Sequence, residues 1–272
     1  MLLVAAGSAW AATLDRIKST GAIALGYREG AAPFSFKDRE GRVRGYSVDL
    51  CERVAAAIKK ELGLADLKVT WKGVLAATRF DAVRRGDVDI ECGTTTISLS
   101  RMADVDFSVP IFVDGGAVLT RVKAKVSHLV DLKGRKVAVI GGTTTEQALT
   151  RMLRMLDAQA QLVHVKDGEE GMRALSEGSV DGYAADRIVL TGLRQRSAES
   201  GEFELLPSDF SYEPYALVVR RDDPDFRLAV NRALVGVYRS GEIDGIFQRW
   251  LGGLGRPGEL LHAMFYLNTL PE

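Results

Sequence analysis

The stretch Glu91–Arg101, with the sequence ECGTTTISLSR, decides how the rest of the chain is interpreted. It follows a short apolar segment, Val88–Ile90, which predicts a strand. Three consecutive threonines come directly after Gly93, and Arg101 closes the stretch. A strand that leads into hydroxyl-bearing residues brings hydrogen-bond donors to the carboxyl edge of an open α/β sheet, where small ligands usually bind. Arg101 adds a planar cation that suits a carboxylate, although a threonine-rich loop with a surface arginine has the same sequence features.

The composition is that of an ordinary soluble globular protein. The chain has 272 residues, of which 46% are hydrophobic and 26% charged, enough for one large domain or two smaller ones. Lys+Arg and Asp+Glu both number 36, so the net charge is zero and no nucleic-acid-binding surface is expected. No apolar stretch approaches the ~18 residues that a membrane span requires.

Residues 1–12 resemble the end of a secretory signal peptide. Met1–Ala6 is apolar, and Ala9–Ala11 has the small-x-small form of a signal-peptidase site, although the positive region that begins such peptides is missing. We expect a signal-peptide remnant over residues 1–12 and therefore a periplasmic protein. An apolar N-terminal strand is the alternative.

Cys51 and Cys92 leave two possibilities open. An oxidising compartment permits one disulfide between them. Cys51, however, falls on the apolar face of a predicted helix and Cys92 at a strand end, so two free, buried thiols are the alternative. The three histidines, at positions 128, 164 and 262, show no ligand spacing, so we expect no metal and no cofactor.

Two predicted helices frame the threonine-rich stretch. Apolar residues recur at helical spacing from Ser47, the expected N-cap, until Gly63. A second helix follows Gly142, where Thr143 with Glu146, or Thr144 with Gln147, would make a capping box. The free amides at that N-terminus favour an anion, although a well-capped structural helix is the alternative.

An internal similarity indicates two lobes. Residues 82–89 resemble residues 174–181: each is a helix end, a glycine and then a strand. The first strand leads to the threonines and Arg101 and the second to Asp186, so opposite charges suit a zwitterion held between the lobes. The apolar strands Gly116–Val122 and Ala216–Val219 bracket the second unit, so the chain would cross between lobes twice, as a hinge requires.

In their order and spacing, a set of short motifs resembles the extracytoplasmic solute-binding proteins of amino-acid ABC transporters. The resemblance implies an α/β, two-lobe periplasmic-binding-protein fold (type II) whose lobes are joined by two hinge strands. We place lobe 1 over residues 13–117 and 216–272 and lobe 2 over residues 118–215. The motifs are Pro33–Phe36, Gly45–Leu50, Val88–Asp89, Thr94–Thr96, Arg101, Phe107–Pro110, Leu132–Gly134, Gly142–Thr144, Gly241–Glu242 and Trp250–Leu251.

The resemblance also implies a set of ligand-binding residues. Arg101 would pair with the α-carboxylate of an amino acid, helped by Thr96 and the Thr143 region, and Asp186 would take the α-ammonium. The residues expected in the site are Arg28, Arg79, Thr94, Thr96, Arg101, Thr143, Thr144 and Asp186.

Within the family the chain is most similar to glutamate/aspartate binders. Arg28 and Arg79 match the two arginines that hold the side-chain carboxylate there, and Glu91–Thr94 matches that branch as well. Two positions depart from it: a pocket serine of that branch is Ala76 here, and a histidine of the second lobe falls near Gly168. Glutamate or aspartate is therefore the narrower prediction within the broader one of an amino acid.

We expect binding without catalysis. The protein would act as a monomer that captures an amino acid and delivers it to the membrane permease of an ABC transporter. One alternative is a periplasmic dehydratase of the prephenate or arogenate type on the same scaffold, for which Glu29, Glu91 and Asp186 are the candidate acids and bases. The other is a ligand-sensing module.

Overall fold

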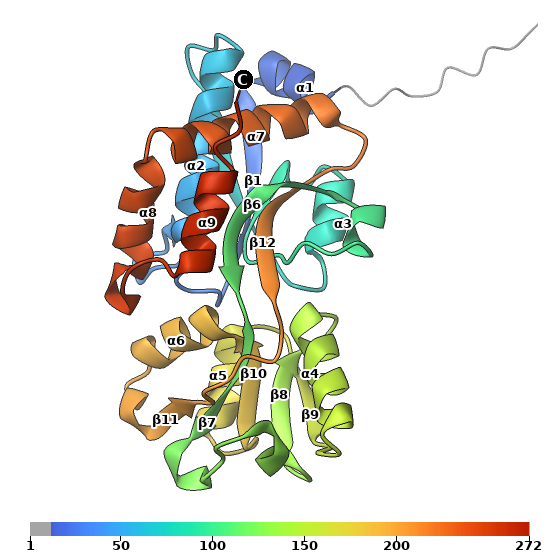
Figure 1. The fold of residues 1–272 in the computed structure, drawn as a ribbon. Coiled ribbons are helices and arrows are strands. Elements are labelled where there is room, and N and C mark those ends of the chain that lie inside the picture. The colour runs from blue at the N-terminus through green and yellow to red at the C-terminus, as the bar shows by residue number, and fades with distance from the viewer. Residues whose placement is uncertain (1–11, 272) are drawn as a thin grey trace, which may run out of the picture.

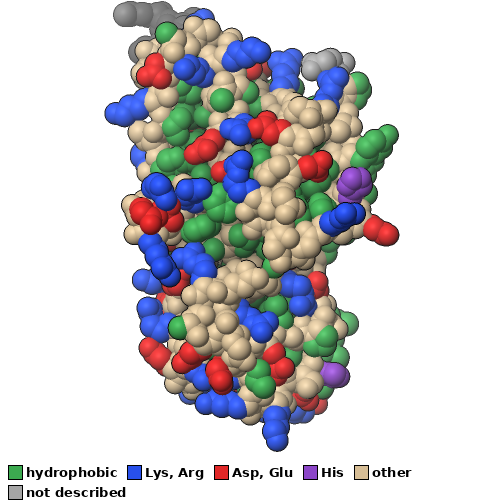
Figure 2. All heavy atoms as spheres, turned by 90° about the vertical axis from the view of Figure 1, so that its left-hand side faces the viewer, with side chains coloured by type: hydrophobic (Ala, Val, Ile, Leu, Met, Phe, Trp, Pro, Cys, Tyr) green, Lys and Arg blue, Asp and Glu red, His purple; other side chains and the backbone are tan. Residues whose placement is uncertain are grey.

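Two five-stranded sheets, one in each of two lobes, organise the computed structural model, which describes residues 12–271 (Figure 1). The prediction of a two-lobe α/β fold is confirmed. The sheet of the first lobe has the strand order β4-β1-β5-β12-β6, and that of the second has the order β11-β7-β10-β8-β9. The molecule narrows where the lobes meet, and Lys and Arg side chains gather near this junction (Figure 2).

The strands have the following bounds. The first sheet contains β1 (Ala22–Arg28), β4 (Lys68–Val74), β5 (Ile90–Cys92), β6 (Asp106–Asp114) and β12 (Glu213–Val219). The second contains β7 (Gly116–Arg121), β8 (Lys136–Ile140), β9 (Gln161–Val165), β10 (Gly182–Asp186) and β11 (Phe203–Leu205). A small hairpin is formed by β2 (Phe36–Lys37) and β3 (Val43–Arg44).

Helices cover the sheets. The first lobe has α1 (Thr13–Thr20), α2 (Tyr46–Glu61), α3 (Arg79–Arg84), α7 (Pro224–Arg239), α8 (Glu242–Leu251) and α9 (Glu259–Leu267). The second has α4 (Thr144–Met155), α5 (Gly168–Ser176) and α6 (Arg187–Arg196). Single 3-10 turns lie at η1 (Arg101–Ala103), η2 (Val122–Ala124), η3 (Leu129–Leu132), η4 (Ser200–Glu202) and η5 (Gly252–Leu254).

Alternation along the strands explains how the helices pack in the second lobe. Val137 and Val139 of β8 join the core beneath α4, whereas Ala138 between them joins the core beneath α5 and α6. Because both faces of this sheet are covered, its strands are apolar almost throughout.

Helix α9 was not predicted from the sequence, because it carries apolar residues on nearly every side: Leu261 is buried while Leu260 and Tyr266 are exposed.

The parallel strands of both sheets run so that their carboxyl ends lie toward the junction between the lobes. Strand β1 runs parallel to β4 and β5, and β8 runs parallel to β9 and β10. Strands β6 and β12 pair antiparallel and lie side by side toward the second lobe (Figure 1). Since only Gly115 separates β6 from β7, the chain changes sheet within a single residue. The carboxyl ends of the parallel strands can therefore meet between the lobes.

The expected lobe boundaries, after residues 117 and 215, fall inside β7 and β12, each of which belongs to one sheet. We therefore propose to divide the lobes at Gly115 and ahead of Glu213.

The signal-peptide prediction lies outside the described residues, except for Ala12. No helix within residues 12–271 is long and apolar enough to cross a membrane.

Local predictions near the threonine-rich stretch need two corrections. Helix α2 begins at Tyr46 after Gly45, so Ser47 is not its N-cap. The Ser47 hydroxyl instead donates to the carbonyl oxygen of Gly93 at 2.8 Å, which ties the helix to the start of that stretch. The strand predicted over residues 88–90 begins at Ile90 and runs to Cys92. The Asp89 side chain, just ahead of this strand, accepts hydrogen bonds from Arg16 and from the amide of Ala24.

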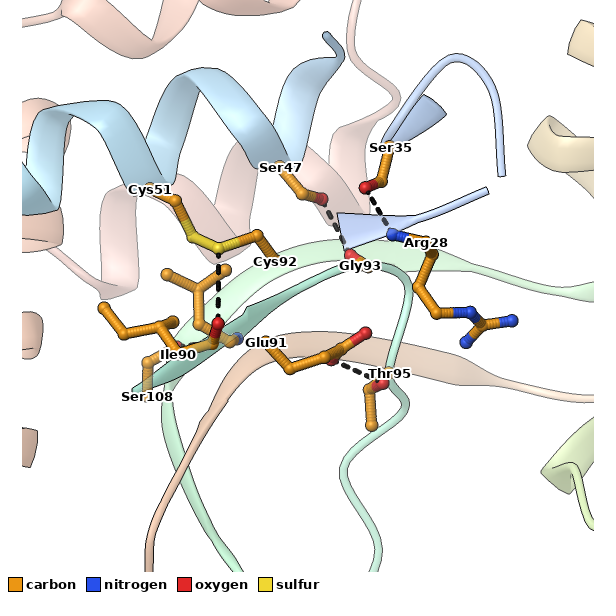
Figure 3. The surroundings of a disulfide bond; sticks show 11 residues. Arg28, Ser35, Ser47, Cys51, Ile90, Glu91, Cys92, Gly93, Thr95 and Ser108 are labelled. Carbon is orange, nitrogen blue, oxygen red and sulfur yellow. Dashed lines mark hydrogen bonds between the residues drawn. A yellow bond between two sulfur atoms is a disulfide. The ribbon is translucent and has the colours of Figure 1, made fainter. Parts of the chain in front are cut away.

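The two cysteines form a disulfide, which resolves the alternative left open by the sequence. The bridge joins Cys51 of α2 to Cys92 of β5, and both residues are fully buried. Figure 3 shows Glu91 projecting from β5 on the side away from this bridge, toward Thr95. The disulfide therefore anchors the strand from which the threonine-rich stretch departs.

Candidate functional site

A small cavity of about 50 Å³ lies between the lobes, and all eight residues expected in the site line it. The first lobe contributes Arg28, Arg79, Thr94, Thr96 and Arg101, and the second contributes Thr143, Thr144 and Asp186. Further lining residues that were not expected are Glu29, Gly30, Ala31, Ile140, Thr145, Gly168, Tyr183, Ala184, Ala185 and Val189. Because residues of both lobes line this cavity, we expect a ligand to enter while the lobes are apart.

Three arginines form the first-lobe wall of the cavity. Arg28 ends β1 and Arg79 begins α3, and both are buried. Arg101, in η1, donates from Nη1 to the carbonyl oxygen of Thr96 at 2.7 Å and lies over the ring of Phe80. Within residues 12–271, none of the three has a carboxylate oxygen within 4.0 Å. This wall therefore presents positive charge that no neighbouring side chain neutralises by direct contact.

Burial lowers the pKa of two of these arginines, Arg79 and Arg101. Desolvation, and then the charge of Arg28, lowers the pKa of Arg79 to about 9. Desolvation also lowers the pKa of Arg101, against the opposing charges of Glu213 and Asp186. With a pKa of about 9, Arg79 remains protonated at neutral pH. An anion that enters the cavity would relieve this desolvation penalty.

Asp186 provides the opposite charge from the second lobe. It lies at the end of β10, where Oδ1 accepts from the Thr145 hydroxyl at 2.8 Å and Oδ2 from the Tyr215 hydroxyl at 2.6 Å. The same Tyr215 hydroxyl lies 3.2 Å from Oδ2 of Asp114, at the end of hinge strand β6. Burial, and then the charge of Glu213, raises the pKa of Asp186 to about 6. Burial and the charge of Asp186 raise the pKa of Asp114 well above its usual range.

Glu213, the first residue of β12, connects the two lobes and was not anticipated from the sequence. Its Oε2 accepts from the hydroxyl of Thr96 at 2.6 Å and from that of Thr144, at the start of α4, at 2.7 Å. Its Oε1 accepts from Ser211 at 2.6 Å, and the residue is buried. One carboxylate therefore joins threonines that face each other across the cleft. No sequence pattern could have indicated this role, because it exists only when the lobes are together.

The N-terminus of α4 follows one of the two predicted capping arrangements. Thr143 is the N-cap, and its hydroxyl oxygen accepts from the amide of Glu146 at 3.1 Å. The Glu146 carboxylate accepts from the amide of Gly142 and not from that of Thr143, so the reciprocal bond lies one residue earlier than in a capping box. This cap leaves the Thr144 hydroxyl free to reach Glu213.

Glycines allow the lobes to approach closely. A Cβ at Gly168, the first residue of α5, would lie 2.3 Å from the carbonyl oxygen of Gly30. A Cβ at Gly192 of α6 would lie 2.5 Å from the carbonyl oxygen of Ala32. Both contacts join the second lobe to the loop that follows β1. Side chains at these two glycines would therefore hold the lobes apart.

The two departures from the glutamate/aspartate-binding pattern lie at or near the cavity. Gly168 lines it directly, and Ala76 is buried, with its carbonyl oxygen accepting from the guanidinium of Arg79. Among residues 12–271, no group of three or more His, Cys, Asp or Glu side chains is placed to hold a metal ion. The cavity is therefore lined by arginines, by threonine hydroxyls and by the carboxylates of Glu29 and Asp186.

The chain is similar to one family of bacterial proteins and to several of its characterised relatives. The family model for bacterial extracellular solute-binding proteins, family 3, matches residues 23–253. The L-glutamate/L-aspartate-binding protein of Pseudomonas aeruginosa is 37% identical over 239 residues, which cover 88% of this chain and 79% of that protein. The glutamate/aspartate import solute-binding protein of Escherichia coli is 32% identical over 246 residues, covering 90% and 80% of the two chains. A solved structure of an ancestral amino acid-binding protein, a precursor of cyclohexadienyl dehydratase, is similar with a TM-score of 0.73 at 28% identity, covering 88% of this chain and 99% of that one.

Proposed function

Because the chain belongs to the bacterial extracellular solute-binding proteins of family 3, we propose that it captures an acidic amino acid between its lobes and delivers it to the permease of an ABC importer. The names of two similar relatives, which bind glutamate and aspartate, support the ligand class. We further propose that the protein works as a monomer in the periplasm, with residues 1–12 as a signal-peptide remnant.

The observation that carries this proposal is the uneven charge of the cavity. The buried Arg28 and Arg79 and the partly buried Arg101, none with an ion pair among residues 12–271, face Asp186 from the other lobe. Glutamate and aspartate carry two carboxylates and one ammonium, which match this arrangement. In the proposed pose the α-carboxylate pairs with Arg101, the α-ammonium with Asp186, and the side-chain carboxylate with Arg28 and Arg79. Thr94 would supply its hydroxyl, whereas Thr96, Thr143 and Thr144 would supply backbone amides, because their hydroxyls already donate to Glu213 or to the carbonyl oxygen of Ile140.

The pose accounts for capture without catalysis. Arg101 and Asp186 belong to different lobes, so the ligand can pair with both only when the cleft closes. Such a ligand has a higher affinity for the closed state and shifts the population toward it. Closure also excludes water, which strengthens each ionic contact.

A ligand screen tests the proposed function. Thermal unfolding of the purified protein would be followed with each of the twenty amino acids and with dicarboxylic acids. We expect glutamate and aspartate to stabilise the protein by about 2.7 kcal/mol at a concentration of 100 times the Kd. The absence of stabilisation by either acid, together with stabilisation by a neutral or basic amino acid, would contradict the acidic assignment.

Arg79 tests the side-chain subsite separately. Arg79→Met should weaken glutamate and aspartate binding by about 2–5 kcal/mol, because it leaves a desolvated carboxylate unpaired. Arg84→Met is the matched control, since Arg84 lies on the same short helix but is exposed and pairs with Asp81 and Asp104. An equal loss of affinity for neutral amino acids in the Arg79 variant would exclude a subsite for the side-chain carboxylate.

A dehydratase is the second candidate, because a similar solved structure is described as a precursor of one. Two of the three candidate acids and bases are poorly placed for this chemistry, whereas Asp186 lines the cavity with a pKa raised to about 6 and is used in the proposed pose to pair with the ligand ammonium. The Glu29 side chain is 54% exposed and accepts from Tyr27. Glu91 is buried, but its Oε2 accepts from Thr95 and it does not line the cavity. Incubation with prephenate or arogenate, with detection of the aromatic product, distinguishes the two functions.

A further inference from the structure

Tyr183 carries a polar group that nothing in the fold explains. It lies on β10, is fully buried and lines the cavity. Within the described part of the chain, its hydroxyl has no hydrogen-bond partner. Buried hydroxyls in native proteins almost always have a partner, because an unpaired one is destabilising. An unpaired hydroxyl at the wall of a binding cavity therefore indicates a partner that arrives with the ligand.

The packing around Tyr183 fixes where its ring lies. A Cβ at Gly171 of α5 would lie 2.5 Å from both Cζ and Cε2 of Tyr183, so the ring occupies space that this glycine leaves open. On β10 the residue pairs with Leu119 of β7 and Ala138 of β8, which are themselves fully buried. A ring held in this way cannot turn to find another partner inside the lobe. Burial, followed by the charge of Asp186, raises the pKa of Tyr183, so the hydroxyl keeps its proton and can donate it.

The position of Tyr183 associates it with the side-chain end of the cavity. Its ring packs on α5, and the first residue of that helix, Gly168, contacts the backbone of Gly30. Gly30 follows Arg28 by two residues, so the helix on which Tyr183 packs lies against the loop that leaves Arg28. The α-carboxylate end, by contrast, is marked by Arg101 and Thr96. Tyr183 and Arg28 are thus placed to approach the same ligand group from opposite lobes.

We propose that the Tyr183 hydroxyl donates a hydrogen bond to the side-chain carboxylate of the bound amino acid and so helps to select acidic ligands. This inference rests on the proposed function and adds a contact from the second lobe to a subsite that otherwise consists of first-lobe arginines. Because the contact forms only in the closed state, it links recognition of the side chain to closure of the cleft.

Tyr183→Phe tests the inference, because it removes one oxygen and preserves the ring. Calorimetric titration with glutamate and with aspartate should show affinity about 10- to 100-fold lower than for the wild-type protein, as expected for a hydrogen bond to a charged group. The ligand-free melting temperature should be unchanged or up to about 2–4 °C higher, because the variant no longer buries an unpaired hydroxyl.

Thr120→Val is the matched control. Thr120 on β7 also buries a hydroxyl without a partner among the described residues, but it does not line the cavity. This variant should bind both acids as the wild-type protein does. Wild-type affinity in Tyr183→Phe, or an equal loss in both variants, would overturn the role of Tyr183 while leaving the proposed function intact. Failure of the wild-type protein to bind either acid would overturn the proposed function and this inference with it.

Discussion

Gly192 should control how far the lobes can close. A Cβ at this position in α6 would lie 2.5 Å from the carbonyl oxygen of Ala32, 2.9 Å from its carbonyl carbon and 3.0 Å from Cδ of Pro33. These atoms belong to the backbone and to a proline ring, so they cannot move aside as a flexible side chain would. For Gly192→Ala, an ordinary contact of 3.4 Å requires α6 and this loop to move apart by about 0.9 Å.

The expected loss of ligand affinity depends on whether the clash occurs in the open or in the closed state. Overpacking typically costs about 1–3 kcal/mol, and here it affects only the closed state. In the open state Gly192→Ala should stabilise α6 by up to about 1 kcal/mol, because alanine is the better helix former. Because α6 is helical in both states, this gain applies equally to both, and only the clash opposes closure. We therefore expect a loss of ligand affinity of about 5- to 150-fold, which corresponds to the clash alone.

Calorimetric titration measures this loss, and small-angle scattering of the ligand-saturated protein measures closure. Gly236→Ala is the matched control, because Gly236 lies inside α7, where a Cβ would meet nothing within 4 Å. The control gains the same helix propensity without a clash. If Gly192→Ala binds as tightly as Gly236→Ala and reaches the same radius of gyration, the contact with Ala32 does not limit closure and the reasoning is wrong.

Three further predictions concern charge and covalent structure. Arg101→Met should weaken every amino-acid ligand by about 2–5 kcal/mol in calorimetry while the protein stays folded by circular dichroism, because the α-carboxylate is common to all of them. In the closed, ligand-free protein, burial raises the pKa of Asp186 to about 6, so this state binds a proton below that pH, whereas a bound ammonium favours the ionised carboxylate. Affinity should therefore fall as the pH decreases from 7 to 5, by at most tenfold per pH unit. Titrations at several pH values check this, and a flat profile would exclude the pairing. Replacing Cys51 and Cys92 together by alanine should lower the free energy of unfolding by about 2–4 kcal/mol in denaturant titrations, because the disulfide closes a long loop. An unchanged denaturation midpoint would show that the disulfide does not stabilise the fold.

The sequence indicates the polar residues at strand ends better than it indicates how the lobes meet. Arg101 and Asp186 could be assigned to one site because each follows a predicted strand that ends in polar residues, whereas Arg28 and Arg79 were assigned to it by the family resemblance. Glu213 and Gly192 could not be found in this way, since their roles depend on the distance between two lobes that are each complete without them. The disulfide had to stay open for a similar reason: the distance between α2 and β5 is a property of packing and not of either segment alone.

Two groups of residues therefore affect binding in different ways. Glu213 accepts from Thr96 and Thr144 across the cleft, so it stabilises the closed state whatever the ligand is, and the same holds for the close approach at Gly192. Changes at these positions alter the closing equilibrium, and a changed closing equilibrium multiplies all dissociation constants by one factor. Arg79 and Tyr183 would contact only the ligand side chain, so changes there should alter the ratio of dissociation constants between acidic and neutral amino acids. That ratio, measured in each variant, separates residues that close the protein from residues that choose its ligand.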